Sequence, residues 1–580
     1  MLKGLSRLVF GLGLSICLSA GVSAAHELAP KKPKRASQSV NIKITPWGPA
    51  QEAVDAAVQR VERSSEVQSL LKGAKYRLLE FSYLETEDKS RPAQPPTRFR
   101  AVFYDYTNDR SIVAESDFAA QTPVIAREAY YNPTPSDEEF GEAVSIVRTD
   151  KRFGALLGDK SLDVFRPMPP TTVLSGTAER LVNVGLRNSR SDENEIVSVS
   201  IRSGTVVRYP ENAPPQSKAD AGSCGPVAAN QPTSGENTAG QYQMTVTQNG
   251  APLWEMLIIR PSASSGTRKS GIELRDVKYK GKSVLKRGHV PILNVQYAPP
   301  ENCGPYRDWQ WQEDMFATPA TGNIDPAPGI RLVPDGQAAT TILETGNDTG
   351  NFRGVAVYKQ DNGYGLEVVL ITELQAGWYR YIMEWRFAPD GTIRPRYGFG
   401  ATNNNCVCEA HNHHAYWRLD FDIVQPNNKV FQMERGRKFQ KPLSLETRGN
   451  KNHQTKRSLL IQNSAGDEAY MLVPNMSDGV ADTFAVNDFW VLRYKNIVGG
   501  TNVQNEIDDG ETCINCTSVT APIRINPFVN GESIVDQDVV VWYGAHFMHN
   551  DGHNLLDPDR YSLVLSGAHV VGPDIRPVRW

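Results

Sequence analysis

Two segments near the middle of the chain alternate strictly between apolar and polar side chains. From Tyr379 to Phe387, aromatic and Met side chains hold the odd positions and mostly charged ones the even positions. From His411 to Ile423 the pattern repeats, with two histidines on the apolar face and aspartates on the other. A period of two is typical of antiparallel strands with one buried face. We therefore expect Tyr379, His411 and His413 to point into a core and the charged positions to face solvent.

The periodicity of apolar positions also divides the whole chain into predicted domains. From residue 241 to 580 nearly every periodic segment is a strand, separated by Gly, Pro and Asn, which predicts a large antiparallel β-sandwich. Residues 46–130 and 131–208 each read as a helix followed by strands, so each predicts a small α+β domain. Residues 209–240 predict a linker, and residues 25–45 a flexible polar lead. The expected fold class is mainly β, with α+β character overall.

The first 24 residues read as a secretory signal. Lys3 and Arg7 precede a short apolar run, and Val22-Ser23-Ala24 is a small-residue cleavage site. The run is too short for a membrane span, so we expect a secreted or periplasmic protein. The mature N-terminus is expected at Ala25, and N-terminal sequencing that found Met1 intact would contradict export.

Charge and cysteine content narrow the function further. The net charge of −3 and the lack of a long basic block argue against a nucleic-acid partner. Six cysteines remain after cleavage, and an exported chain can pair them in disulfides, although the sequence leaves their connectivity open. They are Cys224, Cys303, Cys406, Cys408, Cys513 and Cys516.

The His411-x-His413 pair suits a single metal ion, because both imidazoles share one face of a strand. A buried histidine pair satisfied by hydrogen bonds is the alternative. A soft Zn or Cu(I) site built from Cys406, Cys408 and the two histidines is a second alternative. His414, on the other face, is expected at the surface.

Several ordered motifs resemble copper amine oxidases. The stretch from Gly377 to Tyr381, followed by Asp390-Gly391, is similar to the region in which that family converts a Tyr to topaquinone. His411-Asn412-His413, followed by Arg418-Leu419-Asp420, looks like the family's copper-binding strand. The stretch from Asp538 to His549 resembles the strand that carries the third copper histidine. The two small domains resemble the cystatin-like domains that precede the family's catalytic domain.

This resemblance implies a copper- and topaquinone-dependent enzyme. It would oxidise primary amines with dioxygen to aldehyde, ammonia and hydrogen peroxide, and it would be a homodimer. The resemblance implies a role for each of seven residues: His411, His413 and His549 as copper ligands, Tyr379 as the quinone precursor, and Asp420, Asp422 and Asp538 as candidate calcium ligands.

A carboxylate must also accept the substrate's α-proton. The resemblance places the base-carrying segment after Tyr297, and Asp314 is the implied base, with its neighbour Glu313 as the alternative. The sequence departs from the family pattern at Trp378, where the family has Asn, and at Arg380, where it has an acid. Two other functions therefore stay open: a copper-binding relative without turnover, and a β-sandwich binding protein with a structural metal.

Overall fold

The computed structural model describes residues 39–84, 94–129, 132–167, 170–173, 179–188, 194–208, 225–229, 240–266, 268–297, 306–319, 324–361, 365–402, 404–408, 411–438, 441–476, 478–481, 487–495, 497–498, 501–502, 525–526, 528–549 and 570–580. The expected signal segment and most of the expected linker lie outside these ranges. No described helix is long and apolar enough to cross a membrane.

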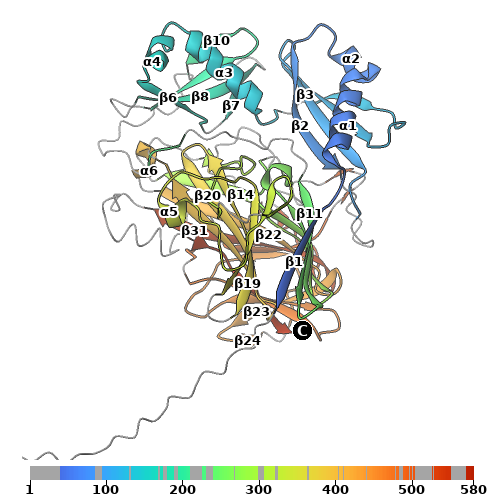
Figure 1. The fold of residues 1–580 in the computed structure, drawn as a ribbon. Coiled ribbons are helices and arrows are strands. Elements are labelled where there is room, and N and C mark those ends of the chain that lie inside the picture. Colours follow the sequence, from blue (N-terminus) through green and yellow to red (C-terminus); the bar gives the residue numbers. More distant parts are fainter. Residues whose placement is uncertain are drawn as a thin grey trace, which may run out of the picture.

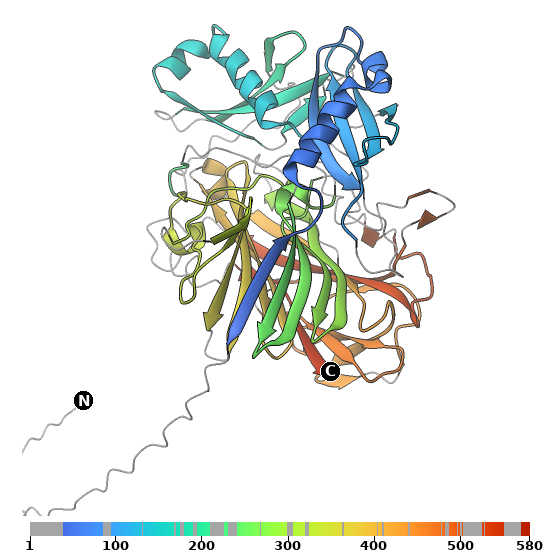
Figure 2. The ribbon, with the colours of Figure 1, turned by 45° about the vertical axis from the view of Figure 1, so that its right-hand side comes forward.

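A two-layered β-sandwich forms the larger part of the molecule, with two small α+β units side by side at one end (Figure 1; Figure 2). The prediction of a mainly β fold with a large C-terminal sandwich is confirmed. One layer runs in the spatial order β1 (Val40–Pro46), β11 (Gln241–Gln248), β12 (Ala251–Ile259), β13 (Glu273–Tyr279), β14 (Lys282–Tyr297), β22 (His411–Phe421), β31 (Gln537–His549), β28 (Phe489–Arg493) and β25 (Thr447–Gly449), and β15 (Tyr306–Arg307) also pairs with β14.

The second layer packs its apolar face on the first. It runs β16 (Ile324–Ala327), β17 (Ile330–Leu332), β18 (Val355–Asp361), β19 (Leu366–Ala376), β20 (Tyr379–Phe387), β21 (Ile393–Ala401), then β32 (Val570–Val571) and β33 (Asp574–Arg579), then β27 (Ala469–Val473), β26 (Ser458–Asn463), β23 (Asn427–Glu434) and β24 (Arg437–Lys438). β23 also pairs with β31, which joins the layers. Between the layers lies the main hydrophobic core.

Each small unit packs helices on its own sheet. The first contains α1 (Gln51–Arg63), α2 (Ser65–Leu70), β2 (Tyr76–Leu84), β3 (Arg98–Asp105), β4 (Arg110–Asp117) and β5 (Ile125–Ala129). The second contains α3 (Asp137–Thr149), α4 (Gly154–Gly158), β6 (Leu162–Phe165), β7 (Thr171–Val173), β8 (Arg180–Asn188), β9 (Asn194–Ser200) and β10 (Thr205–Arg208). Helical spacing of Val54, Ala57 and Val61 explains which face of α1 is buried. Ser136 caps α3 by accepting the N–H of Glu139 at 3.1 Å.

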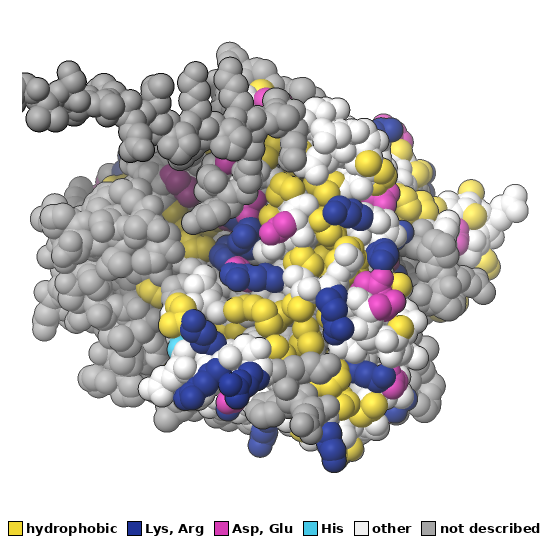
Figure 3. Space-filling view, turned by 90° about the horizontal axis from the view of Figure 1, so that it is seen from below, with side chains coloured by type: hydrophobic (Ala, Val, Ile, Leu, Met, Phe, Trp, Pro, Cys, Tyr) yellow, Lys and Arg dark blue, Asp and Glu magenta, His cyan; other side chains and the backbone are white. Residues whose placement is uncertain are grey.

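Short elements complete the fold. They are η1 (Pro261–Ala263), α5 (Ile342–Thr345), α6 (Asn405–Cys408), β29 (Ile497–Val498) and β30 (Thr501–Asn502). Seen from the end away from the small units, Lys and Arg side chains are spread among hydrophobic and uncharged ones, with Asp and Glu between them (Figure 3). The described part of this face therefore carries charges of both signs.

The prediction of a flexible lead over residues 25–45 is wrong from Val40 onward. β1 pairs with β11 along its whole length, and Val40 and Ile44 are buried in the main core. The alternation Val40-x-Ile42-x-Ile44 is a strand signal, which the polar composition of the surrounding lead obscured.

The prediction of solvent-facing charges on the two alternating strands is also wrong. In β20, Arg380 is only 2 % exposed and Glu384 8 %. A second, smaller core that includes Phe316, Ile342 and Ile382 covers this face. Both faces of β20 are therefore buried, and its charged side chains find partners inside the protein.

Candidate active site

Tyr379 opens β20 and points into the main core. It is 1 % exposed, and its ring stacks on that of Tyr381 with centroids 5.4 Å apart. The ring of Trp378 lies 6.0 Å away, and Phe165, from β6 of the second small unit, contacts Trp378 at 6.3 Å. Trp378 therefore links the second small unit to the site.

The structure brings His411 and His413 next to Tyr379. Their ring centroids lie 5.8 Å and 4.9 Å from that of Tyr379, and 4.8 Å from each other. Both histidines stand at odd positions of β22 and are at most 3 % exposed. Phe399, from β21, stacks on His413 at 4.6 Å. The two imidazoles and the phenol are thus enclosed together by aromatic rings.

β31 supplies the position of the third expected histidine. In the antiparallel ladder between β22 and β31, the backbone of His549 pairs with that of His411. Tyr297, on the other side of β22, also pairs with His411 through its backbone. The side chains of His549 and Tyr297 lie outside the described part of the structure.

The described residues fit a copper ion better than the soft-metal alternative. Two imidazole rings whose centroids lie 4.8 Å apart can bind one ion, and imidazole suits Cu(II). Cys406 is disulfide-bonded, with a partner outside the described side chains, so its sulfur is not available as a thiolate ligand. This rules out the site of Cys406, Cys408 and the two histidines as it was predicted.

His414 is not a surface residue, contrary to the sequence prediction. It is 0 % exposed, and its Nδ1 lies 2.8 Å from Nδ1 of His546, its cross-strand neighbour on β31. Nε2 of His546 lies 2.9 Å from Oδ1 of Asp488. Burial, with the nearby His546 and Lys451, holds the pKa of His414 well below its usual value. These residues form a buried polar chain on the face of β22 opposite to His411 and His413.

Asp314 does not face Tyr379, so the sequence prediction for its orientation is wrong. Its Oδ2 lies 2.5 Å from Nε of Arg380. Arg380 also donates to Asp348, from Nε to Oδ1 at 2.7 Å and from Nη2 to Oδ2 at 3.0 Å. Arg380 and Tyr379 are successive residues of β20 and point to opposite faces. Glu373 belongs to the same buried group, with carboxylate oxygens of the three acids within 4.8 Å of one another. Arg380 is thus held by Asp314 and Asp348.

Glu313 does lie on the Tyr379 side, because its bridge partner Leu374 is paired with Tyr381. Its carboxylate is occupied, however: Arg260 donates to both oxygens from Nε and Nη2. Both carboxylate oxygens of Glu313 are therefore engaged by one buried guanidinium.

The sequence interpretation missed Asp308. It is 0 % exposed, and its Oδ2 accepts the hydroxyl of Tyr381, whose ring stacks on Tyr379. Burial and the Asp308 carboxylate raise the pKa of Tyr381 well above its usual value. Asp308 is thus a buried carboxylate on the Tyr379 face. Its signal in the sequence was its place between Arg307 and Trp309, within the segment expected to carry the base.

The structure also brings the three expected calcium ligands together. Asp420, Asp422 and Asp538 each place a carboxylate oxygen within 4.8 Å of the other two. Asp420 and Asp422 are buried, and Asp538 is half-buried. Such a cluster of hard oxygen atoms suits Ca²⁺.

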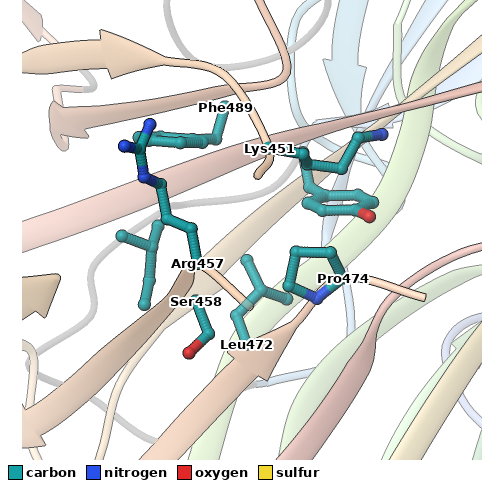
Figure 4. A pocket seen from close by; sticks show the side chains of 8 residues that line it. Lys451, Arg457, Ser458, Leu472, Pro474 and Phe489 are labelled. Carbon is teal, nitrogen blue, oxygen red and sulfur yellow. The ribbon is translucent and has the colours of Figure 1, made fainter. Parts of the chain in front are cut away.

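The structure also contains a pocket beside the core, away from Tyr379 (Figure 4). Lys451 and Arg457 lie on opposite sides of it, and Leu472, Pro474 and Phe489 contribute apolar walls. None of the side chains that line it belongs to the group around Tyr379.

Asp314→Asn should remove a pH dependence of stability between about pH 4 and pH 6. Burial raises the pKa of Asp314 from 3.8 to about 6, against the opposing effect of Arg380. Over this range the folded state keeps a proton that the unfolded state has released. The free energy of unfolding therefore falls as the pH rises through this range.

Urea unfolding of the wild type and the variant, from pH 4 to pH 7, checks this expectation. Asp335→Asn is the control, because the Asp335 side chain is 77 % exposed, and it should keep the wild-type slope. Equal slopes in wild type and Asp314→Asn would contradict the assignment.

Comparison with known proteins supports the fold. No protein-family model matches the sequence, and no curated protein matches it. Several solved structures share its architecture, among them three amine or lysyl oxidases. A copper-containing benzylamine oxidase from Hansenula polymorpha has 13 % identity and a TM-score of 0.56, covering 92 % of this chain and 97 % of its own. A lysyl oxidase from Pichia pastoris has 12 % identity and a TM-score of 0.56, covering 92 % and 90 %.

An amine oxidase from Aspergillus nidulans has 15 % identity and a TM-score of 0.54, covering 92 % of this chain and 89 % of its own. All three likenesses extend over both small units and the sandwich, since they leave out less than a tenth of this chain. This protein therefore has the fold of the copper amine oxidases.

Proposed function

We propose that this protein oxidises primary amines with a copper ion and a topaquinone formed from Tyr379. The observation that carries the proposal is the contact of the Tyr379 ring with the rings of His411 and His413, inside a fold shared with copper amine oxidases. When bound, copper and quinone would supply a two-electron oxidation of amine to aldehyde, with dioxygen as the oxidant and ammonia and hydrogen peroxide as products.

The ligands in this proposal are His411, His413 and His549. The first two present imidazoles from one face of β22, and the third stands at the register position across from His411. Neutral imidazole is a suitable ligand for Cu(II). Replacing His411 or His413 should therefore remove copper and, with it, the conversion of Tyr379.

The remaining residues would control water and protons. Trp378, Tyr381 and Phe399 surround the phenol and imidazole rings with apolar surface, which keeps bulk water away from the reacting ring. Asp308 is the proposed proton acceptor, because it is a buried carboxylate on the Tyr379 face of the core and accepts the hydroxyl of Tyr381. Proton transfer at Asp308 would then be coupled to the Tyr381 hydroxyl.

The partners in this proposal are a primary amine and dioxygen, with a second copy of the chain in a homodimer. Export to the periplasm or the exterior is part of the proposal and rests on the N-terminal sequence. A calcium ion at Asp420, Asp422 and Asp538 is also proposed, with a structural role, because the three carboxylates converge away from Tyr379 on the other face of β22.

Removing calcium should lower the thermal stability of the copper-loaded protein. A ligand at 100 times its Kd stabilises the folded state by about 2.7 kcal/mol. We expect EGTA to lower the melting temperature of the wild type but not that of Asp422→Asn, as measured by calorimetry.

Asp536→Asn is the matched control. Asp536 directly precedes β31, the strand that carries Asp538, but it does not belong to the group of Asp420, Asp422 and Asp538. It should respond to EGTA as the wild type does. A melting temperature of the wild type that does not change with EGTA would remove calcium from the proposal.

A quinone stain tests the main proposal. Copper-free protein, incubated in air with Cu(II), should develop a visible quinone band and stain by redox cycling after electrophoresis. Protein that binds one copper ion per chain and stays colourless would refute the proposal.

One observation favours a second candidate, a copper-binding protein without amine turnover. The acid expected to serve as base, Asp314, is held by Arg380 on the wrong face of β20. If Asp308 does not replace it, the chain would bind copper and form the quinone but not consume amine. Copper analysis together with peroxide production from added amines distinguishes the two candidates.

A further inference from the structure

Arg418 is a buried guanidinium for which the described residues supply no ion pair. It lies on β22 at an even position, on the face opposite to His411 and His413, and is 1 % exposed. Within the described part of the chain, none of its three guanidinium nitrogens has a hydrogen-bond partner. Guanidinium groups stay charged at any ordinary pH, and burying such a charge without a partner is strongly unfavourable.

Two more buried polar atoms without partners lie beside it in the same row of the sheet. Arg418 pairs across β14 with His289 and across β31 with Trp542, so all three side chains share one face. His289 and Trp542 are both 0 % exposed, and among the described residues neither Nε2 of the histidine nor Nε1 of the indole has a hydrogen-bond partner. Three adjacent strands thus bring such nitrogens to one row of the sheet.

Arg418 and Trp542 make this group rich in donors. Nδ1 of His289 lies 3.0 Å from Oγ of Ser265 and 3.9 Å from a carboxylate oxygen of Glu273, so this side of the ring faces a hydroxyl and an acid. Burial lowers the pKa of His289 against the opposing effect of Glu273, and Arg287 and Arg418 lower it further. The guanidinium N–H groups of Arg418 and the indole N–H of Trp542 can only donate hydrogen bonds.

Neighbouring carboxylates are committed elsewhere. Glu273 already pairs with two arginines, Arg275 at 2.6 Å and Arg287 at 3.1 Å. Asp420, two residues along the same face, lies with Asp422 and Asp538 in the acidic triad. With calcium in the proposed site of Asp420, Asp422 and Asp538, and Glu273 paired with Arg275 and Arg287, these neighbouring carboxylates are taken up by other cations.

We propose that the row His289, Arg418 and Trp542 binds one small anion of the chloride class inside the sandwich sheet. A water molecule could accept hydrogen bonds there, but it would leave the guanidinium charge uncompensated. An anion accepts the same hydrogen bonds and neutralises the charge. Because every side chain in the row is buried, the ligand is enclosed and cannot be a large organic anion. This site is independent of the proposed oxidase function.

Bromide is the probe for this site. Crystals of the copper- and calcium-loaded protein, grown in sodium gluconate and soaked in sodium bromide, should give an anomalous peak in contact with the Arg418 guanidinium and the Trp542 indole. Density for water alone at that place, with bromide peaks only at the surface, would overturn the proposal.

Thermal unfolding gives an independent readout. At constant ionic strength, replacing gluconate by chloride should raise the melting temperature of the wild type by about 1–3 °C for each tenfold increase in chloride. Arg418→Met should lose this response and should be at least as stable as the wild type in gluconate, because it removes an uncompensated charge. Trp542→Phe keeps a ring but loses one donor, so about tenfold or more chloride should be needed for the same effect.

Arg493→Met is the matched control, since it also removes one positive charge. The Arg493 side chain is 43 % exposed on the neighbouring strand β28 and 3.9 Å from Glu532. It should respond to chloride as the wild type does. Equal chloride responses in wild type and Arg418→Met, or an Arg418→Met protein that is less stable than the wild type in gluconate, would overturn the proposal.

Discussion

Tyr379→Phe should abolish the quinone band and the redox stain while leaving copper bound. The phenol oxygen is the atom at which ring oxidation begins, and phenylalanine lacks it. Phe keeps the apolar ring that packs against Tyr381 and His413, so the two-histidine arrangement should survive. Visible spectroscopy of the copper-loaded, aerated variant should show no quinone absorption, and metal analysis should show copper at the wild-type level.

The control for this result is Tyr397→Phe. Tyr397 lies on the same face, 5.8 Å from Tyr381, and its hydroxyl donates to Gln310 at 2.8 Å. It should form the quinone normally despite losing a buried hydrogen bond. A quinone band in Tyr379→Phe would place the cofactor on another tyrosine, with Tyr381 the next to test.

Asp308→Asn should form the quinone but turn over amine about 10²–10⁴-fold more slowly. A loss of this size corresponds to about 3–5 kcal/mol in the activation free energy. Asparagine can still accept the Tyr381 hydroxyl through its carbonyl oxygen, so the local packing should persist. Its side chain cannot accept a substrate proton. Steady-state kinetics should therefore show a fall in kcat larger than any change in KM, and the acid limb of the kcat/KM profile should disappear.

Asp314→Asn is the companion variant. Because Asp314 pairs with Arg380 on the other face of β20, we expect turnover near the wild-type value. A large loss of turnover in Asp314→Asn, with little in Asp308→Asn, would restore the assignment made from the sequence and contradict the geometry.

The alternation of β20 and β22 was enough to predict which residues enter the core. Tyr379, His411 and His413 share the inward face that their odd positions indicated. It could not predict that the other face is buried as well. What covers that face of β20, such as Phe316 and Ile342, comes from distant parts of the chain. The periodicity within one strand contains no information about which distant residues pack on its second face.

Asp314 was misplaced for a related reason. The segment from Asp308 to Asp314 is not a regular strand, since a single bridge at Glu313 is its only ladder contact among the described residues. The regular alternation of side chains between the two faces is therefore interrupted along this segment. Gln310 meets Tyr397 on the Tyr379 side, whereas Gln312 donates to Gln375 on the other side at 2.9 Å. Alternation holds only where continuous pairing keeps the backbone extended.

The pairing of β1 with β11 makes the two small units an insertion in a single sheet. Pro46 stands opposite Tyr242, and the N–H of Trp47 donates to the carbonyl of Gln241 at 2.8 Å. The chain thus leaves the sandwich and returns to it at neighbouring points, so a short hairpin turn could replace the intervening residues without breaking the sheet. Such an excision would also take away Phe165 and uncover Trp378. The inserted units are dispensable to the topology of the sandwich, but they form part of the wall beside Tyr379.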